Sequence, residues 1–230
     1  LAGSVAHEIR NPLNLISLSV DHLGDAYRPD DPQRAEKYGS VVASIRQELG
    51  RLNRLVEEFL NFGRPPRLDP RACAVEDVIA EVLALTGPHA ADQQVVVDRS
   101  DSPGLPKVWV DPDGLRTCLV NLVVNAVQAL PERGRVVIAA APVTTDDGEP
   151  GVEVLVRDDG PGIPPAHLDR VFEPYFSTKE GGVGLGLAIT QRIVEESGGS
   201  IGVTSRQGEG TTFRLVLPVT PAAQPAASGR

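Results

Sequence analysis

The sequence has few residues of several kinds, and each shortage excludes a class of protein. It has only two cysteines, Cys73 and Cys118, in 230 residues, in no disulfide or metal-site pattern. Both lie in apolar stretches, so we expect buried, reduced thiols. The 22 basic residues are outnumbered by 31 acidic ones. The resulting net charge of −9 argues against a protein that binds the phosphate backbone of nucleic acids.

Long apolar runs and methionine are also missing. No segment is long enough to span a bilayer, and no signal peptide is recognisable. Methionine is absent throughout, including at position 1. We therefore expect a cytoplasmic piece of a longer protein, attached to a membrane, if at all, only through a region upstream of Leu1. The remaining composition, 41% hydrophobic and 23% charged, is typical of globular domains.

The first sixty or so residues predict two amphipathic helices. Apolar residues recur at spacings of three and four in both. In the first helix, Leu1 to about Tyr27, they are Val5, Ile9, Leu13, Ile16, Val20 and Leu23; in the second they are Val42, Ile45, Leu49, Leu52, Val56 and Phe59. The turn Arg28–Pro32 would join them into an antiparallel hairpin. One hairpin cannot cover both stripes, so we expect a four-helix dimer, the alternative being packing against the rest of the chain.

A histidine lies on the polar side of the first helix. At about 100° per residue, His7 is nearly opposite the apolar stripe, and Asn11, one turn later, shares its face. Glu8 follows His7 directly. A solvent-facing imidazole beside a carboxylate suits nucleophilic attack with proton transfer. On this stretch alone, an ordinary surface histidine explains the pattern equally well.

A linker rich in proline, residues 63–70, divides the hairpin, 1–62, from a second domain, 71–219. In that domain helix and strand patterns alternate. Helices are expected at Val75–Ala91, Pro112–Leu130 and Leu185–Ser197, and strands at Gln94–Asp98, Lys107–Val110, Val136–Val143, Val152–Arg157, Ile201–Ser205 and Thr212–Pro218. The segment Gly160–Gly186 is too long for an ordinary connection, which favours a functional lid. The tail, 220–230, is expected to be disordered.

Two short segments of the second domain carry polar groups suited to a nucleotide. Asn121 and Asn125 lie one helical turn apart among apolar neighbours, and amide oxygens suit Mg²⁺. Asp158 ends a strand before a turn made by Gly160 and Gly162. An ionised carboxylate accepts a hydrogen bond from the amino group of adenine and repels the carbonyl oxygen of guanine. Taken alone, both patterns are common in helix caps and plain turns.

Two further segments of the second domain also carry groups suited to a nucleotide. The run GGVGLGL, Gly181–Leu187, opens a helix, where exposed backbone N–H groups bind phosphates. It lacks the Lys-Ser/Thr of a P-loop and is not a dinucleotide-binding unit. The stretch FEPYFSTK, Phe172–Lys179, offers aromatic anchors and one cation.

In this order the motifs resemble the H, N, G1, F and G2 boxes of bacterial sensor histidine kinases, over Leu1 to about Pro218. The resemblance implies an α+β fold. Its N-terminal antiparallel helical hairpin would form a four-helix bundle as a dimer. An α/β-sandwich ATP-binding domain of the Bergerat type, shared with gyrase-type ATPases, would follow.

The resemblance also implies residue roles. His7 is the phosphorylated residue, Glu8 its acid/base partner, and Asn11 helps Glu8 to position water for dephosphorylating the partner. Asn125 is the Mg²⁺ ligand, supported by Asn121. The implied nucleotide site comprises Asn121, Asn125, Asp158, Gly160, Gly162, Phe176, Lys179, Gly182, Gly184, Leu185, Gly186 and Thr211.

There are two departures from the family pattern. Val183 replaces a frequent Ser or Thr, and Gln128-Ala129 replaces a basic–aromatic pair. Lys179 or Arg133 would have to supply the missing charge.

The expected reaction is phosphoryl transfer from ATP·Mg²⁺ to His7 and then to an aspartate of a response-regulator receiver domain, carried out by a homodimer. One alternative is a pseudokinase scaffold, which only Val183 favours. The other is an ATPase of the gyrase or mismatch-repair kind, which the His7-Glu8 helix and the lack of a transducer domain disfavour.

Overall fold

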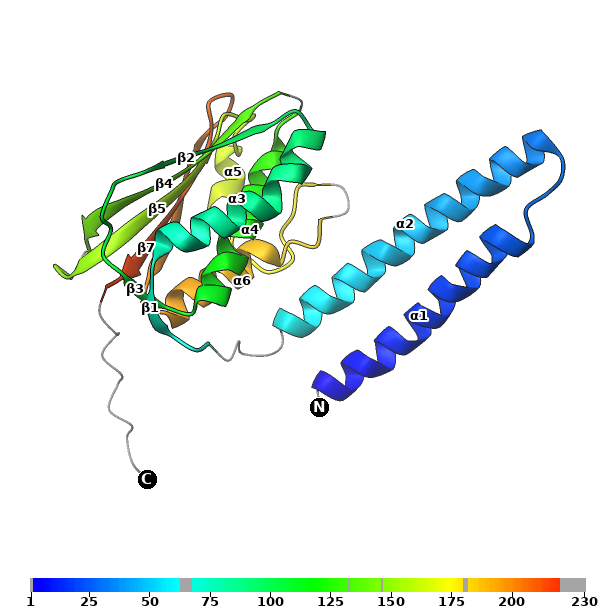
Figure 1. Cartoon of the computed structure of the whole chain (residues 1–230), viewed down its shortest axis with the longest axis horizontal. Helices are drawn as coiled ribbons and strands as arrows, with labels where there is room; N and C mark the ends of the chain where they lie inside the picture. Colours follow the sequence, from blue (N-terminus) through cyan, green and yellow to red (C-terminus); the bar gives the residue numbers. More distant parts are fainter. Residues whose placement is uncertain (1, 63–67, 132, 146, 180–181, 220–230) are drawn as a thin grey trace. The chain divides into compact units, whose positions relative to one another are not determined.

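The structure, a computed structural model, describes residues 2–62, 68–131, 133–145, 147–179 and 182–219 (Figure 1). It forms two compact units, residues 1–66 with 177–185, and residues 67–176 with 186–230. The predicted tail, 220–230, and most of the predicted linker, 63–70, lie outside the described residues. Across the described residues, no helix has the length and apolar character needed to cross a membrane.

The predicted helical hairpin is confirmed. Helices α1 (Ala2–Ala26) and α2 (Pro32–Phe62) run side by side in opposite directions (Figure 1). Val20, Val42 and Leu49 are buried between them.

Polar contacts near the turn fix how the two helices pair. The Tyr38 hydroxyl donates to the carbonyl oxygen of Leu23 over 2.6 Å. Arg46 Nε donates to Asp21 Oδ1 over 2.7 Å.

The hairpin buries only part of each apolar stripe. Among the stripe residues whose side chains are described, those left exposed are Ile16, Leu23, Ile45 and Leu52, with exposed fractions between 38% and 47%. The helical spacing predicted this exposure, because two helices alone cannot bury two wide apolar stripes.

The second unit is built on a five-stranded mixed sheet. The strand order is β2-β4-β5-β7-β6, with only the β2–β4 pair parallel. Its strands are β2 (Val96–Asp101), β4 (Arg135–Thr144), β5 (Pro150–Asp158), β6 (Ser200–Arg206) and β7 (Gly210–Pro218). A separate two-stranded sheet pairs β1 (Arg71–Cys73) with β3 (Val108–Val110). Strand β1 was not predicted, because three residues are too few to show an alternating pattern.

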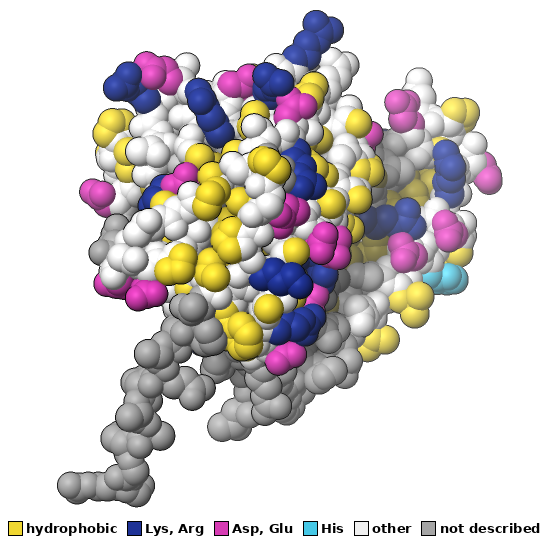
Figure 2. Space-filling model, turned by 60° about the vertical axis from the view of Figure 1, so that its left-hand side comes forward, with side chains coloured by type: hydrophobic (Ala, Val, Ile, Leu, Met, Phe, Trp, Pro, Cys, Tyr) yellow, Lys and Arg dark blue, Asp and Glu magenta, His cyan; other side chains and the backbone are white. Residues whose placement is uncertain are grey.

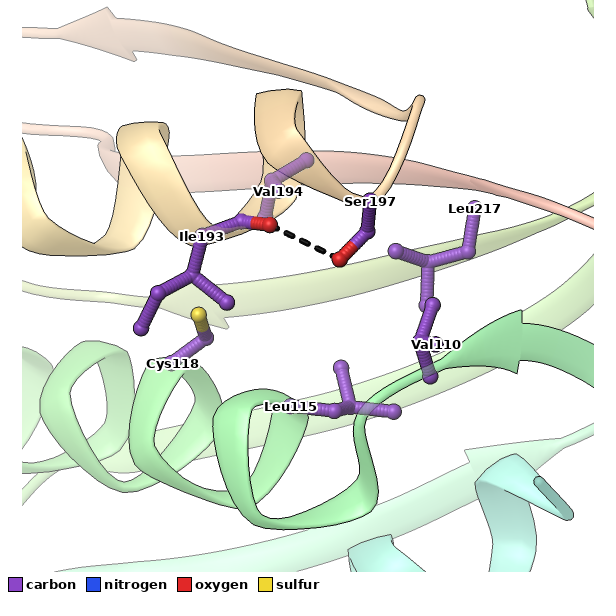
Figure 3. A pocket seen from close by; sticks show the side chains of 7 residues that line it. All are labelled: Val110, Leu115, Cys118, Ile193, Val194, Ser197 and Leu217. Carbon is purple, nitrogen blue, oxygen red and sulfur yellow. Dashed lines mark hydrogen bonds between the residues drawn. The ribbon is translucent and has the colours of Figure 1, made fainter. Parts of the chain in front are cut away.

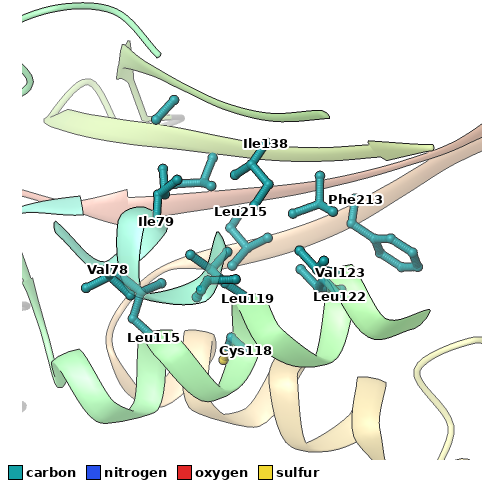
Figure 4. Close-up of a cluster of buried hydrophobic side chains, with 14 of the residues drawn as sticks. Val78, Ile79, Leu115, Cys118, Leu119, Leu122, Val123, Ile138, Phe213 and Leu215 are labelled. Atoms are coloured by element: carbon teal, nitrogen blue, oxygen red, sulfur yellow. The ribbon is translucent and has the colours of Figure 1, made fainter. Parts of the chain in front are cut away.

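Three helices cover one face of the five-stranded sheet: α3 (Val75–Asp92), α4 (Pro112–Ala129) and α6 (Gly186–Glu196) (Figure 1). Alternate residues of β4 point into this layer, and Val136, Ile138 and Ala140 are buried there. Leu119 and Leu122 of α4 meet Leu215 of β7 in the same core (Figure 4). The α/β sandwich is therefore confirmed. The predicted lid is not wholly irregular, since it contains a short helix, α5 (Pro165–Leu168).

Charged side chains lie on the opposite face of the sheet. Arg135 pairs with Asp98, and Arg214 with Glu153, across neighbouring strands. Figure 2 shows acidic and basic side chains mixed with apolar ones over the face that it presents. Exposed ion pairs of this kind contribute little to stability, so most of the stability of the sheet comes from the apolar face that the helices cover.

Helix α4 begins where the sequence predicted. Asp111 Oδ1 accepts hydrogen bonds from the backbone N–H groups of Asp113, over 2.9 Å, and Gly114, over 3.4 Å. Pro112 occupies the first helical position, where no backbone donor is needed. This cap sets the register of the helix that carries Asn121 and Asn125.

Both cysteines are buried and unpaired, and Cys118 lies between α4 and α6. It lines a cavity of about 10 Å³, space for at most one water molecule, with Leu115, Ile193 and Ser197 (Figure 3). The Cys118 thiol lies 3.8 Å from the carbonyl oxygen of Thr190. Burial raises the pKa of this thiol from 9.0 to about 12.

This pKa shift predicts a loss of stability at high pH. Between pH 9 and 12 the thiol stays protonated in the folded chain but ionises in the unfolded chain, so rising pH favours unfolding. From pH 8.5 to 10.5 the wild-type free energy of unfolding should fall by about 2 kcal/mol more than that of a Cys118→Ala variant. Urea unfolding under reducing conditions measures the difference. An equal fall in the free energy of unfolding in the two proteins would contradict the raised pKa of Cys118.

Candidate functional site

The carboxylate of Asp158 lies at the end of β5 and is 95% buried, since its exposed fraction is 5%. Its Oδ1 accepts two backbone hydrogen bonds, from Gly160 over 2.9 Å and from Thr211 over 3.2 Å. The next residue, Asp159, follows the end of β5 and is exposed. Asp159 Oδ1 instead accepts from the backbone N–H of Arg135 over 2.8 Å. Of the two adjacent carboxylates, only Asp158 is oriented inside the domain.

Three glycines allow the backbone to approach Asp158 and the neighbouring turn. A Cβ on Gly160 would lie 2.8 Å from Asp158 Oδ1, and one on Gly210 would lie 2.0 Å from the Asp158 carbonyl oxygen. A Cβ on Gly162 would lie 2.3 Å from the carbonyl oxygen of Arg206. Gly162 and Gly210 also have positive φ angles, of 71° and 94°. Side chains at these positions would force the turn apart.

A serine on β6 joins this turn to the sheet. Ser205 Oγ accepts a hydrogen bond from the Ile163 N–H over 2.8 Å and donates to the carbonyl oxygen of Gly210 over 2.9 Å. The hydroxyl of Thr211, which is buried, lies 3.0 Å from Ser205 Oγ. Hydrogen bonds and close packing therefore connect Asp158, Gly160, Gly162 and Thr211 where β5 ends and β7 begins.

A second connected group lies where α6 begins. Asn121 Nδ2 on α4 donates to the hydroxyl of Thr190 on α6 over 2.9 Å. A Cβ on Gly186, the first residue of α6, would lie 2.4 Å from Asn121 Oδ1. The Asn121 amide thus holds the first turn of α6 against α4. Exposed N–H groups at such a helix start can bind phosphate.

Asn125, one turn after Asn121 on α4, is half-buried. The resemblance implies an amide ligand for Mg²⁺ at this position, and a half-buried amide oxygen is a suitable donor.

Short-range contacts link some of the described residues at the end of the predicted lid, 177–179 and 182–185. Ser177 Oγ accepts from the Lys179 N–H over 3.1 Å, and the Gly182 N–H donates to the Lys179 carbonyl oxygen over 3.1 Å. A Cβ on Gly182 would lie 2.4 Å from Ser177 Oγ. Gly184 has a φ of 72°, and Leu185 is fully buried.

The predicted residues of the hairpin are described only in part. The backbones of His7, Glu8 and Asn11 belong to α1. Their side chains lie outside the described residues, so the imidazole and its carboxylate neighbour remain predictions.

Sequence reasoning missed two residues that support the site, Thr190 and Ser205. Thr190 lies one helical turn after Gly186, on the face of α6 that packs against α4. Ser205 ends a strand and carries no motif of its own. Only the pairing of β6 with β7, which places Ser205 opposite Thr211, shows its role.

Two family models match this chain. Residues 1–67 match the family model described as "His Kinase A (phospho-acceptor) domain". Residues 110–221 match the model described as "Histidine kinase-, DNA gyrase B-, and HSP90-like ATPase". The chain belongs to the sensor histidine kinase family.

Two curated relatives are similar over nearly the whole chain. Sensor histidine kinase ZraS of Escherichia coli (strain K12) is 39% identical over 219 residues, which are 95% of this chain and 45% of ZraS. Signal transduction histidine-protein kinase AtoS of the same strain is 33% identical over 221 residues, 96% of this chain and 35% of AtoS. The chain thus spans less than half the length of these relatives.

Two solved structures share the architecture. Full-length ShkA in complex with AMPPNP has a TM-score of 0.75 and 29% identity, covering 97% of this chain and 46% of ShkA. Histidine kinase ThkA in complex with response regulator protein TrrA has a TM-score of 0.68 and 29% identity, covering 95% of this chain and 61% of the ThkA chain.

The contact between Gly186 and Asn121 predicts the effect of one methyl group. In a Gly186→Ala variant the new Cβ, 2.4 Å from Asn121 Oδ1, must displace the start of α6. We expect the affinity for an ATP analogue, measured by calorimetry, to fall at least about tenfold, because the N–H groups expected to bind phosphate move with the helix.

A matched control is Gly202→Ala on β6, where a Cβ would meet no atom within 4 Å. It should bind like the wild type. Equal binding by the Gly186→Ala variant would show that the first turn of α6 does not hold the phosphates.

Proposed function

We propose that this chain is the kinase core of a sensor histidine kinase, which transfers the γ-phosphoryl group of ATP to His7 and then to an aspartate of a response-regulator receiver domain. Residues 1–62 would be the dimerisation and phosphotransfer domain, and 71–219 the ATP-binding domain. The observation that carries the proposal is the buried, doubly hydrogen-bonded carboxylate of Asp158 beside a glycine turn, in a chain whose hairpin carries His7.

Asp158 would select the base. Two backbone N–H groups already orient its carboxylate, so an incoming amino donor meets a fixed acceptor and little reorganisation is needed. Adenine would present an amino group to this carboxylate, whereas guanine would present a carbonyl oxygen, which a carboxylate repels. Gly160 and Gly162 leave the space beside it free of side chains. Together they favour ATP over GTP.

The phosphates would lie at the start of α6. The backbone N–H groups of its first turn, which begins at Gly186, would face them, and the resemblance adds Lys179, Gly182 and Gly184 to the phosphate-binding residues. Asn125 would give an amide oxygen to Mg²⁺, and Asn121 would support that arrangement while holding α6 through Thr190. When bound, Mg²⁺ neutralises phosphate charge that would otherwise repel the nucleophile.

His7 would be the nucleophile. A neutral ring nitrogen attacks the γ-phosphorus, a P–N bond forms, and the bond from phosphorus to the bridging oxygen of ADP breaks. Glu8 would hold the ring in the correct tautomer and accept the proton that the imidazole loses. Phosphoryl transfer depends mainly on such positioning and charge neutralisation.

The phosphoryl group would pass next to a receiver-domain aspartate. Support comes from the likeness to ThkA, whose structure was solved with the response regulator protein TrrA. Glu8 and Asn11, one turn apart, would position water when the regulator is dephosphorylated. We place these reactions in the cytoplasm, and with a net charge of −9 we expect no nucleic-acid ligand.

The active form would be a homodimer. A second hairpin would cover the partly open stripe residues of α1 and α2 and complete a four-helix bundle. The match of residues 1–67 to the phospho-acceptor domain model supports this pairing.

Replacing His7 tests the transfer step. After incubation with ATP labelled on the γ-phosphate, the wild-type chain should carry an acid-labile, base-stable label, and a His7→Gln chain should carry less than about 1% of it. The matched control is His22→Gln, which removes an exposed histidine of the same helix and should keep the label. Labelling of the His7→Gln chain would disprove the site, and an unlabelled wild type that binds ATP would indicate a scaffold.

A further inference from the structure

Three polar side chains lie in a row across one end of the five-stranded sheet. Strand pairing places Asp158 of β5 directly opposite Thr211 of β7, and Thr211 directly opposite Ser205 of β6. Directly opposite residues point to the same face of an antiparallel sheet, with Cβ atoms about 5 Å apart. Buried Val136 of β4 continues the row beyond Asp158, so the row lies on the face that the helices cover.

The Ser205 hydroxyl has one hydrogen and two lone pairs, and its neighbours determine how all three are used. The carbonyl oxygen of Gly210, 2.9 Å away, can only accept, so it takes the Ser205 hydrogen. The backbone N–H of Ile163, 2.8 Å away, can only donate, so it takes one lone pair. The second lone pair remains for the contact of 3.0 Å with Thr211 Oγ1.

Thr211 must therefore be the donor in its contact with Ser205. Its hydroxyl hydrogen points to Ser205, and its oxygen turns only lone pairs toward the rest of its surroundings. Thr211 is 6% exposed, and a buried hydroxyl needs a partner within the protein. The direction of the Thr211 hydrogen is thus set by Ser205 and not by solvent.

Two acceptors consequently lie side by side, the ionised Asp158 carboxylate and the Thr211 hydroxyl oxygen. An amino group on an aromatic ring carries two hydrogens about 120° apart, so at ordinary hydrogen-bond lengths it bonds two acceptors about 5 Å apart. That spacing is close to the separation of directly opposite side chains in a sheet. The pair therefore suits an exocyclic amino group better than one carboxylate alone.

We propose that Ser205 is a positioning residue for the adenine base. By taking the hydrogen of Thr211, it keeps the Thr211 oxygen available beside Asp158 as a second acceptor for the amino group. This inference rests on the proposed function, which places adenine at Asp158, and extends it to a residue outside the predicted site. Without Ser205, the Thr211 hydrogen would turn to another acceptor, such as the Asp158 carboxylate, and would compete with the amino group there.

The experiment measures by calorimetry, in the full chain, the Kd of ATP and of purine riboside triphosphate, which lacks only the amino group. The ratio of the two affinities reports on the amino group alone, because damage to the turn or to the phosphate site weakens both nucleotides together. The variants are Ser205→Ala, Thr211→Val and both together, with Ser205→Thr as the conservative change that keeps the hydroxyl. The matched control is Ser200→Ala, on an exposed residue of β6 that lies on the opposite face.

We expect Ser205→Ala to reduce the preference for ATP over purine riboside triphosphate roughly fivefold. Thr211→Val removes the acceptor itself and should reduce the preference by a similar factor. The double variant should match Thr211→Val, because Ser205 acts only through that hydroxyl. Ser205→Thr should stay within about twofold of the wild-type preference, and Ser200→Ala should equal it.

An unchanged preference in either Ser205→Ala or Thr211→Val would overturn the inference, even where the affinities for both nucleotides fall, since that fall would mark a purely structural role. A double variant with a smaller preference than Thr211→Val would also overturn it, because Ser205 would then act by another route. A wild-type chain that binds the two nucleotides equally, or binds neither, would instead overturn the proposed adenine site at Asp158. The two failures are therefore distinguishable.

Discussion

The buried carboxylate of Asp158 constrains the structure around it. A charge at this depth destabilises a fold unless hydrogen bonds surround it, and backbone N–H groups of Gly160 and Thr211 supply two of them. The Gly160 donor lies in the turn that follows β5, and the Thr211 donor lies in β7, so two separate segments must approach the carboxylate closely. Only glycine at 160 and 210 leaves room for that approach. The Asp158 carboxylate thus explains why residue 160 is glycine, and the close approach of β7 to the Asp158 backbone explains Gly210.

A second close approach that requires glycine occurs at the start of α6. The Asn121 amide holds the first turn of α6, and Gly186 is required because a Cβ would overlap that amide. Rigid parts therefore surround the expected base and the expected phosphates. Part of the predicted lid in the same compact unit is joined to the sheet, because the Ile163 N–H donates to Ser205 Oγ and the Phe172 ring packs on Phe213.

The sequence predicted the elements of the fold well, because helix periodicity, the Asp111 cap and strand alternation are local signals. Strand β1 and helix α5 were missed because each is too short to show a period. The site was predicted only as a set of motifs in order, which the family resemblance connected. What the sequence could not supply was the contacts between distant elements, such as Asn121 with Thr190 or Ser205 with Thr211. Those pairs depend on strand and helix packing, which no local pattern encodes.

Binding of ATP and GTP to an Asp158→Asn variant tests the central claim most directly. Asparagine keeps the size of the side chain but removes its charge and adds a donor. Calorimetry should show ATP affinity falling at least about 30-fold, discrimination against GTP shrinking, and the melting temperature staying close to that of the wild type. Unchanged ATP affinity and unchanged discrimination in a folded variant would contradict the account.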